Sequence, residues 1–222
     1  MSRPTDIVTK ASEVTIAPGP TRLRGELSVP PGAKAIVLFA HGTGSSRLSP
    51  RNQAVARVFQ KAGLGTLLFD LLTEEEEEMD FKNRQFRFDI ELLATRLIDA
   101  THWLAQKDEL KALSVGYFGS STGGAAALVA AAKIGGKVGA VVSRGGRPDL
   151  AGEALRQVKS PTLLIVGERD EVVTGLNQQA LLKLICLKEL KIIARASHLF
   201  EEPGCLDEVT YVATDWFQRH LH

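Results

Sequence analysis

A strand-like run, a short turn rich in glycine and a helix-like run follow one another in the middle of this 222-residue chain. Residues 113–118 are mostly apolar, the turn reads Gly119-Ser120-Ser121-Thr122-Gly123, and residues 125–133 are rich in alanine. Glycine is needed on both sides of Ser121, because a strand and a helix that meet in so tight a turn leave no room for a Cβ. The pattern is typical of a nucleophile elbow, in which a strained backbone raises a serine hydroxyl above the edge of a sheet.

A serine hydroxyl is a weak nucleophile, so this interpretation requires a general base and an acid that orients it. Asp170 follows the apolar run 161–167, and His198 follows the run 190–194. Ser121, Asp170 and His198 would then all lie at the C-terminal ends of parallel strands, where open α/β sheets build their sites. We therefore predict Ser121 as nucleophile, His198 as general base and Asp170 as the orienting acid.

Two alternatives to this assignment stay open. Asp149 follows the preceding predicted strand and is the alternative acid. Ser120 is the alternative nucleophile, although it lies off the centre of the motif. His41, next to the turn at Gly42, is interpreted as structural, and the histidines on or after helices as solvated: His102, His220 and His222.

The loop after the predicted strand 36–40 supplies the second half of an oxyanion hole, which needs two backbone N–H groups aimed at one point. Thr122 would give one N–H group and Thr43 the other, with Gly44 as the alternative. Arg47 and Arg144 lie near the same edge and, with Gly44, are candidate substrate-binding residues. The arginines, with Arg51, either bind an anionic group or pair with nearby carboxylates.

Strand-like and helix-like segments alternate along most of the chain, which predicts a mostly parallel, twisted α/β sheet of seven or eight strands with helices on both faces. Predicted strands cover residues 14–16, 23–29, 36–40, 64–69, 113–118, 138–143, 163–166 and 190–194. Predicted helices include residues 53–62, 86–106 and 206–220. The first two strands are joined only by a turn, so they should form an antiparallel edge. We expect one domain over residues 1–222.

Two segments bear on access to the site. Residues 144–160 have room for one short helix, so no cap domain is expected between the flanking strands. The run Glu74 to Glu78 carries five adjacent like charges and is interpreted as a solvated loop or a frayed helix start. A lid over the site is the less favoured alternative for that run.

Composition excludes several other classes of protein. The hydrophobic fraction of 44% and the charged fraction of 24% are ordinary for a globular protein. A net charge of +1 gives no support for nucleic-acid binding. No apolar stretch approaches the ~20 residues of a membrane span, and residues 1–10 lack the apolar core of a signal peptide, so we expect a cytoplasmic protein. Cys186, placed on a predicted helix, and Cys205 lack metal-ligand spacing, and no metal or cofactor is expected.

These residues give the chain a family resemblance over nearly its whole length. It resembles a small α/β-hydrolase of the dienelactone-hydrolase-like group, in segments that begin at His41, Phe69, Gly116, Ser143 and His198. Similar segments occur in bacterial proteins, some with a fused phosphoribosyltransferase domain, for which 222 residues leave no room. Dienelactone hydrolases use a cysteine nucleophile, whereas this chain has Ser121, so the resemblance implies only a serine hydrolase and does not extend to dienelactone as the substrate.

The function expected from these residues is hydrolysis of a small, accessible ester or related acyl bond through an acyl-enzyme. The expected partner is therefore a small-molecule ester, with no nucleic acid and no membrane, and a homo-oligomer is left open. One alternative is acyl transfer or perhydrolysis, because only the second nucleophile differs. The other is a ligand-binding protein without catalysis on the same scaffold.

Overall fold

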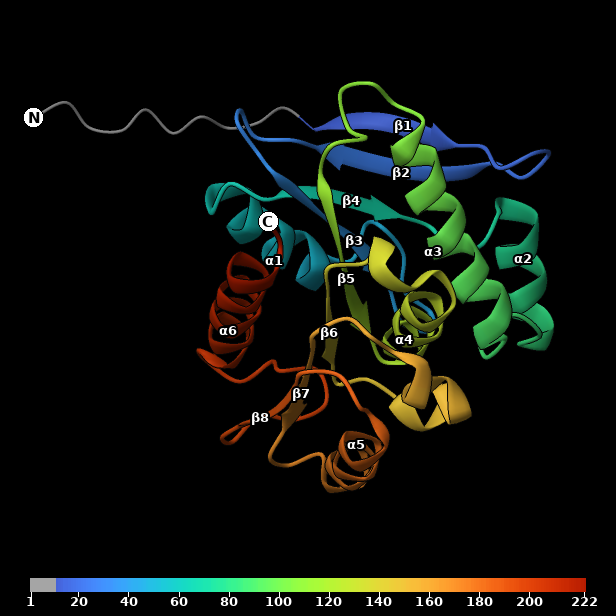
Figure 1. The fold of residues 1–222 in the computed structure, drawn as a ribbon. Helices are drawn as coiled ribbons and strands as arrows, with labels where there is room; N and C mark the ends of the chain where they lie inside the picture. The colour runs from blue at the N-terminus through green and yellow to red at the C-terminus, as the bar shows by residue number, and fades with distance from the viewer. Residues whose placement is uncertain (1–10) are drawn as a thin grey trace, which may run out of the picture.

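A single eight-stranded sheet organises the computed structural model, which describes residues 11–222 (Figure 1). The N-terminal segment 1–10, on which the expectation about a signal peptide rests, lies outside the described residues. The strand order is β1-β2-β4-β3-β5-β6-β7-β8. The strands are β1 (Ser12–Ile16), β2 (Leu23–Ser28), β3 (Ala35–Ala40), β4 (Gly65–Phe69), β5 (Ser114–Ser120), β6 (Ala140–Arg144), β7 (Thr162–Gly167) and β8 (Lys188–Ile193).

The sheet is antiparallel at one edge and parallel elsewhere. Strand β2 pairs antiparallel with both β1 and β4. From β4 through β3 to β8 every neighbouring pair is parallel. The predicted α/β-hydrolase fold class, a mostly parallel sheet with an antiparallel edge, is therefore confirmed. Parallel strands bring their C-terminal ends to one edge, and the loops there come from β3, β4, β5, β6, β7 and β8.

Helices cover both faces of the sheet, as Figure 1 shows. Helices α1 (Pro50–Lys61) and α6 (Cys205–His220) pack on one face, where they bury an aromatic cluster that includes Phe59, Phe118 and Phe217. The other face carries α3 (Ile90–Ala105), α4 (Thr122–Ile134), the 3-10 segment η2 (Pro148–Gln157) and α5 (Glu171–Lys183). Strands β3, β4, β6 and β7 are buried along their whole length, in keeping with their continuous apolar runs.

Two helices begin at other residues than the apolar spacing predicts, because side-chain caps set their first turns. Helix α1 begins at Pro50, and the Ser49 hydroxyl accepts from Asn52 N at 3.4 Å. Helix α3 begins at Ile90 instead of Phe86, and the Asp89 carboxylate accepts from Leu92 N at 2.9 Å. Cys186 was predicted on a helix, and this was wrong: it lies in the turn between α5 and β8, half-buried.

The acidic run differs most from the sequence-based interpretation. It begins a ten-residue helix, α2 (Glu74–Asn83), which lies beside α3 in Figure 1. Thr73 and Glu76 form a capping box in which each side chain binds the other residue's backbone N–H. Negative charges at a helix N-terminus also interact favourably with the helix dipole, so the run supports the first turn of α2. Of the two forms predicted for this run, the solvated loop was wrong, whereas the helix start is present, with a capped first turn instead of a frayed one.

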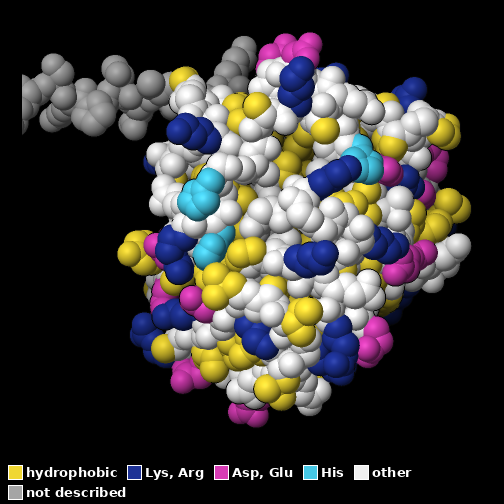
Figure 2. Space-filling view, viewed as in Figure 1, with side chains coloured by type: hydrophobic (Ala, Val, Ile, Leu, Met, Phe, Trp, Pro, Cys, Tyr) yellow, Lys and Arg dark blue, Asp and Glu magenta, His cyan; other side chains and the backbone are white. Residues whose placement is uncertain are grey.

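The β6–β7 connection consists of η2 and short flanking turns, with a kink at Gly152 and no inserted cap domain. Among residues 11–222, no helix combines the length and the apolarity that crossing a bilayer requires. On the face shown in Figure 2, basic, acidic and apolar side chains are intermixed.

Candidate active site

Ser121 occupies a strained turn between β5 and α4. Its φ of 50° and ψ of −121° are values that residues with a Cβ seldom adopt. The flanking glycines make this turn sterically feasible. A methyl group at Gly119 would lie 2.4 Å from the Gly123 carbonyl oxygen, and one at Gly123 would lie 2.1 Å from the Ala40 carbonyl oxygen. Both glycines are therefore required by the close approach of α4 to β5 and β3.

The turn after β6 holds the backbone of Ser121 on both sides. The N–H of Ser121 donates to the Arg144 carbonyl at 3.3 Å, and the Ser121 carbonyl accepts from Arg147 N at 3.1 Å. The same carbonyl accepts from Gly124 N at 3.0 Å within the first turn of α4. Ser121 is thus fixed against the β6 turn as well as by its own helix.

Asp170 and His198 come together across the neighbouring strands. Asp170 follows β7, His198 follows β8, and the Asp170 Oδ2 lies 2.6 Å from the His198 Nδ1. The histidine side chain is 40% exposed and the aspartate 15%. Asp149, the alternative acid, instead accepts two hydrogen bonds from the Arg147 guanidinium, at 2.8 and 2.7 Å. The geometry therefore favours Asp170 as the partner of His198.

The β6 turn also brings His198 to the side of Ser121. A methyl group at Gly145, between the two residues that hold Ser121, would lie 3.5 Å from the His198 Cε1. The Ser121 hydroxyl makes no hydrogen bond within residues 11–222. In ligand-free enzymes the bond between nucleophile and base is often long and shortens only when substrate is bound. The imidazole Nε2, opposite the aspartate-bound Nδ1, is the ring nitrogen that remains available to hydrogen-bond a serine hydroxyl once substrate is bound.

The loop after β3 approaches Ser121 directly. A methyl group at Gly42 would lie 3.0 Å from the Ser121 Cβ. The hydroxyls of Thr43 and Thr122 lie 3.1 Å apart, so the two predicted oxyanion residues are neighbours. Neither backbone N–H donates to another group within residues 11–222. The first N–H groups of α4 have no partner inside the helix, which leaves the N–H of Thr122 available to an oxyanion.

His41 fixes this loop to the end of β4. Its Nε2 accepts from Leu71 N at 3.1 Å, and its Nδ1 lies 3.1 Å from the Gly42 carbonyl, to which it donates. Burial lowers the pKa of His41 and outweighs the opposing effects of Gly42 and Asp70. The neutral ring is the form that can accept from Leu71, so this structure agrees with a structural role for His41.

Two of the three arginines near the site are paired with carboxylates, one of the alternatives that the sequence left open. Arg47 donates to Asp70 through its guanidinium and through its backbone N–H, the latter at 2.8 Å. Arg51 lies 2.9 Å from Glu201. Arg47 is mostly buried and its charge is balanced. A carboxylate on a substrate would have to displace Asp70 to reach it.

Arg144 differs from both, because it is buried without a carboxylate. Its Nη2 donates to the Ser120 hydroxyl at 2.9 Å, and its Nη1 has no partner within residues 11–222. Burial, together with the positive charge of Arg51, lowers the pKa of Arg144 to about 10. Only 7% of the residue is exposed, so Arg144 supports Ser120, the residue before Ser121, and does not present a guanidinium to solvent.

A cavity of about 170 Å³ lies beside the two threonines. Its lining includes Thr43, Gly44 and Thr122, together with the apolar side chains of Leu72, Phe81 and Leu93. Of the candidate substrate-binding residues, Gly44 therefore lines the cavity, whereas Arg47 and Arg144 do not.

A lid over the site was only the less favoured alternative for residues 74–78, and the sequence did not predict that α2 forms a wall of this cavity. The signal that could have found it is Thr73-x-x-Glu76, which is a capping-box pattern and predicts a helix start. The polar lining residue Asp80, at the other end of α2, binds the N–H groups of Phe86 and Arg87 at 2.8 and 2.9 Å. No local pattern in the sequence predicts that bond.

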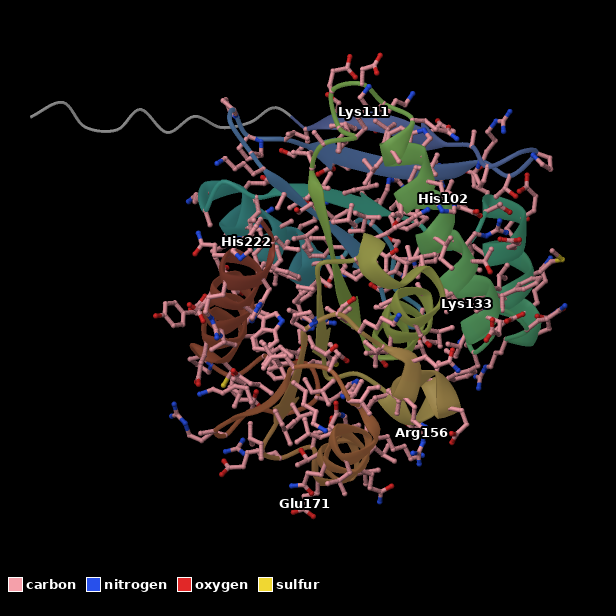
Figure 3. All side chains as sticks on the ribbon, viewed as in Figure 1. His102, Lys111, Lys133, Arg156, Glu171 and His222 are labelled. Atoms are coloured by element: carbon pink, nitrogen blue, oxygen red, sulfur yellow. The ribbon has the colours of Figure 1, made fainter. Side chains whose placement is uncertain are left out.

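The remaining histidines lie away from the site. His102 and His222, labelled in Figure 3, are exposed. His220 is half-buried, and its ring lies 4.4 Å from that of Trp216, so the prediction of a solvated side chain was wrong for it. No group of three or more side chains suited to a metal ion occurs in the described part of the chain.

The sequence matches a known family over most of its length. The family of the alpha/beta hydrolase domain matches residues 33–210. The chain belongs to this family, and it is a dienelactone-hydrolase-like member by structural similarity.

Similar proteins include two with solved structures and one curated protein. A dienelactone hydrolase from Anabaena variabilis ATCC 29413 is 57% identical, with a TM-score of 0.95 over 96% of this chain and 99% of that one. A protein of Mycobacterium tuberculosis, provisionally named a phosphoribosyl transferase, is 56% identical over 94% of this chain. The match spans 46% of that protein, so this chain corresponds to about half of its length. Est1E from Butyrivibrio proteoclasticus shares the fold, with a TM-score of 0.77 at 14% identity.

Proposed function

We propose that the protein is a serine hydrolase that cleaves a small, accessible carboxylic ester through an acyl-enzyme. The observation that carries the proposal is the 2.6 Å contact between Asp170 Oδ2 and His198 Nδ1, at the sheet edge where Ser121 is held in a strained turn. An aspartate bonded to Nδ1 fixes the imidazole tautomer, leaves Nε2 free to accept a proton, and stabilises the imidazolium that forms.

In the first half of the reaction, His198 Nε2 takes the Ser121 proton while Ser121 Oγ attacks the ester carbonyl carbon. The carbonyl π electrons move to the oxygen, and the N–H groups of Thr43 and Thr122 bind the resulting oxyanion. The oxyanion then re-forms the carbonyl, the bond to the alcohol oxygen breaks, and His198 gives its proton to that oxygen. The acyl group is left on Ser121.

In the second half, His198 removes a proton from water, and the hydroxide attacks the acyl carbon. The same N–H groups bind the second oxyanion. Ser121 leaves with the proton from His198, and the carboxylic acid is released. Every step uses groups of this chain and water.

The names of relatives support hydrolysis unequally. The Anabaena variabilis protein is named a dienelactone hydrolase and matches this chain along almost all of both lengths. The Mycobacterium tuberculosis protein carries the name of a transferase, but this chain corresponds to only 46% of it. The triad-like arrangement lies within the matched portion and is chemistry for acyl transfer to water, so we assign the hydrolase activity to this portion.

The test combines labelling and turnover. The wild-type chain should react with a fluorophosphonate at Ser121 and hydrolyse p-nitrophenyl acetate. Peptide mapping locates the adduct, and absorbance at the nitrophenolate band follows the hydrolysis. An unlabelled protein that turns over no ester would overturn the proposal. Adding an alcohol or peroxide to the same assay separates hydrolysis from transfer, because each acceptor yields a different product.

A further inference from the structure

The cavity beside Thr43 and Thr122 lies on the side of Ser121 that faces away from the base. In the sheet order β4-β3-β5-β6-β7-β8, Asp170 and His198 follow β7 and β8. The cavity instead lies by the loop after β3 and by α2, which follows β4. In a serine hydrolase the base must reach the leaving-group oxygen, so the alcohol occupies the side of His198. The acyl chain then extends toward the cavity.

The charges around the cavity disfavour an anionic acyl group. Of its acidic lining residues, Asp70 is paired with Arg47 and Asp80 is paired with Arg87 at 2.8 Å. Glu77, also in the lining, is exposed and forms no ion pair within residues 11–222. The net charge of these side chains and their arginine partners is therefore −1. The apolar walls, from Leu72, Phe81 and Leu93, suit a neutral hydrocarbon chain.

The size of the cavity limits the chain that it can hold. A dry, apolar cavity of about 150 Å³ in another protein accommodates benzene, which has six carbons. At about 170 Å³, this cavity has room for a chain of comparable size. Longer chains would have to leave the cavity and lie in solvent.

The wall formed by α2 is anchored at both ends. Near its N-terminus, Glu76 binds Arg96 of α3 at 2.6 Å, and both side chains are mostly buried. Near its C-terminus, Asp80 accepts the N–H groups of Phe86 and Arg87. Phe81 follows Asp80 directly and is 85% exposed, although it lines the cavity. A large apolar side chain held so openly at the edge of a cavity is available to cover whatever enters it.

We propose that this cavity is the acyl-binding subsite for neutral chains of up to about six carbons, and that Phe81 determines the preferred chain length. This inference rests on the proposed function for the reaction itself. Phe81 covers the outer carbons of the chain, whereas an acetyl group is too short to reach it.

The experiment compares p-nitrophenyl acetate, butyrate, hexanoate, octanoate and laurate for the wild type, Phe81→Ala and Phe88→Ala. Phe88 is the matched control, because it is 57% exposed and does not line the cavity. In the wild type, kcat/KM should rise by up to about fourfold per added methylene as far as hexanoate, the equivalent of about 0.8 kcal/mol, and then level off. Phe81→Ala should lower kcat/KM for the hexanoate ester about fivefold or more. Its kcat/KM for the acetate ester should stay within about twofold of the wild type. Phe88→Ala should follow the wild type.

A second measurement does not depend on turnover. In Ser121→Ala, hexanoate ester added to the protein should shift the NMR signals of Phe81 and Leu93, and acetate ester should shift neither as far. A steady rise of kcat/KM to laurate, or equal profiles for the two phenylalanine variants, overturns the subsite. Absence of hydrolysis with these NMR shifts present rejects the reaction but retains the subsite. Hydrolysis without these NMR shifts retains the reaction but rejects the subsite.

Discussion

The two sides of Ser121 are built on different principles. On the side of β6 to β8, polar groups lie near solvent, and His198 is 40% exposed. On the side of β3 and β4, carboxylates are paired with arginines, and apolar residues close around a cavity. The first side has groups that can move protons. The second has the backbone N–H groups of Thr43 and Thr122 and a cavity with apolar walls.

If the two proposals hold, proton transfer and selection of the acyl group depend on different parts of this chain. Proton transfer needs a base that substrate and water can both reach, so the exposure of His198 is compatible with its proposed role as general base. Selection among acyl groups needs fixed walls and few unpaired charges, and α2 supplies the wall. Substitutions on the first side should therefore change the rate for every ester, and those on the second should change the ranking of esters.

The largest effect is expected from the residue shared by both sides. Ser121→Ala should lower kcat on the order of 10⁶-fold on any ester that the wild type hydrolyses, because no acyl-enzyme can form. Stopped assays at high enzyme concentration measure the residual rate. Ser120→Ala is the matched control: it removes the Arg144 hydrogen bond but should keep fluorophosphonate labelling. An adduct that maps to Ser120 would show that Ser120, and not Ser121, is the nucleophile.

The next effect isolates the β7 and β8 side. Asp170→Asn should lower kcat on the order of 10⁴-fold, because an amide in place of the carboxylate favours the wrong imidazole tautomer. All esters should lose the same factor. Asp149→Asn, which disturbs only the bonds to Arg147, should cost less than about tenfold. If Asp149→Asn is inactive and Asp170→Asn is active, the orienting acid is Asp149, which follows β6.

A moderate effect tests how firmly α2 is held. Burial opposes ionisation of Asp80, but the N–H groups of Arg87 and Phe86 and the Arg87 guanidinium outweigh it and hold the pKa of Asp80 below its ordinary value of 3.8. Asp80→Asn should lower the free energy of unfolding by about 1–3 kcal/mol at neutral pH.

The sign of the pH dependence follows from that lowered pKa. The stabilisation from Asp80 is complete above the unfolded-state pKa and is lost as pH falls through the lower folded-state pKa. Denaturant titrations should therefore show the gap between wild type and Asp80→Asn closing below about pH 4. Glu78→Gln, an exposed neighbour on α2, serves as control and should show no gap at any pH. A pH-independent gap would mean that Asp80 acts by packing alone.

The smallest effect concerns charge at the cavity. Glu77→Gln should raise kcat/KM for a monosuccinyl ester about two- to fivefold, because one exposed repulsion is removed. Neutral butyrate esters should change little, and added salt should reduce the gain. Glu78→Gln again provides the control. A gain of equal size for neutral esters would show that Glu77 acts through the shape of α2.

The fold and the residues on the β7 and β8 side could be predicted because local signals specify them. Ser121 lies between glycines that its turn requires, and Asp170 and His198 each follow an apolar strand. Parallel strands carry such residues to one edge without further information. The roles of these residues stay predictions, while the arrangement of Asp170 beside His198 is present in the structure.

The cavity side could not be predicted in the same way. Arg47 and Asp70 are 23 residues apart, and nothing in either segment indicates that they pair. Arg96 and Glu76 depend likewise on how α2 lies against α3. The acidic run suggested repulsion, because its capping-box pattern was not weighed against the five like charges and because its partner Arg96 is brought to Glu76 only in the folded chain.

The strained turn at Ser121 has a consequence for how such a protein changes over many generations. A residue with a Cβ at φ 50° and ψ −121° costs of order 1–3 kcal/mol that the rest of the fold must supply. Glycine at this position would release that energy and at the same time remove the proposed nucleophile. Selection for persistence alone would therefore drive the chain toward an inert relative with the same shape. Only continued demand for turnover retains the serine.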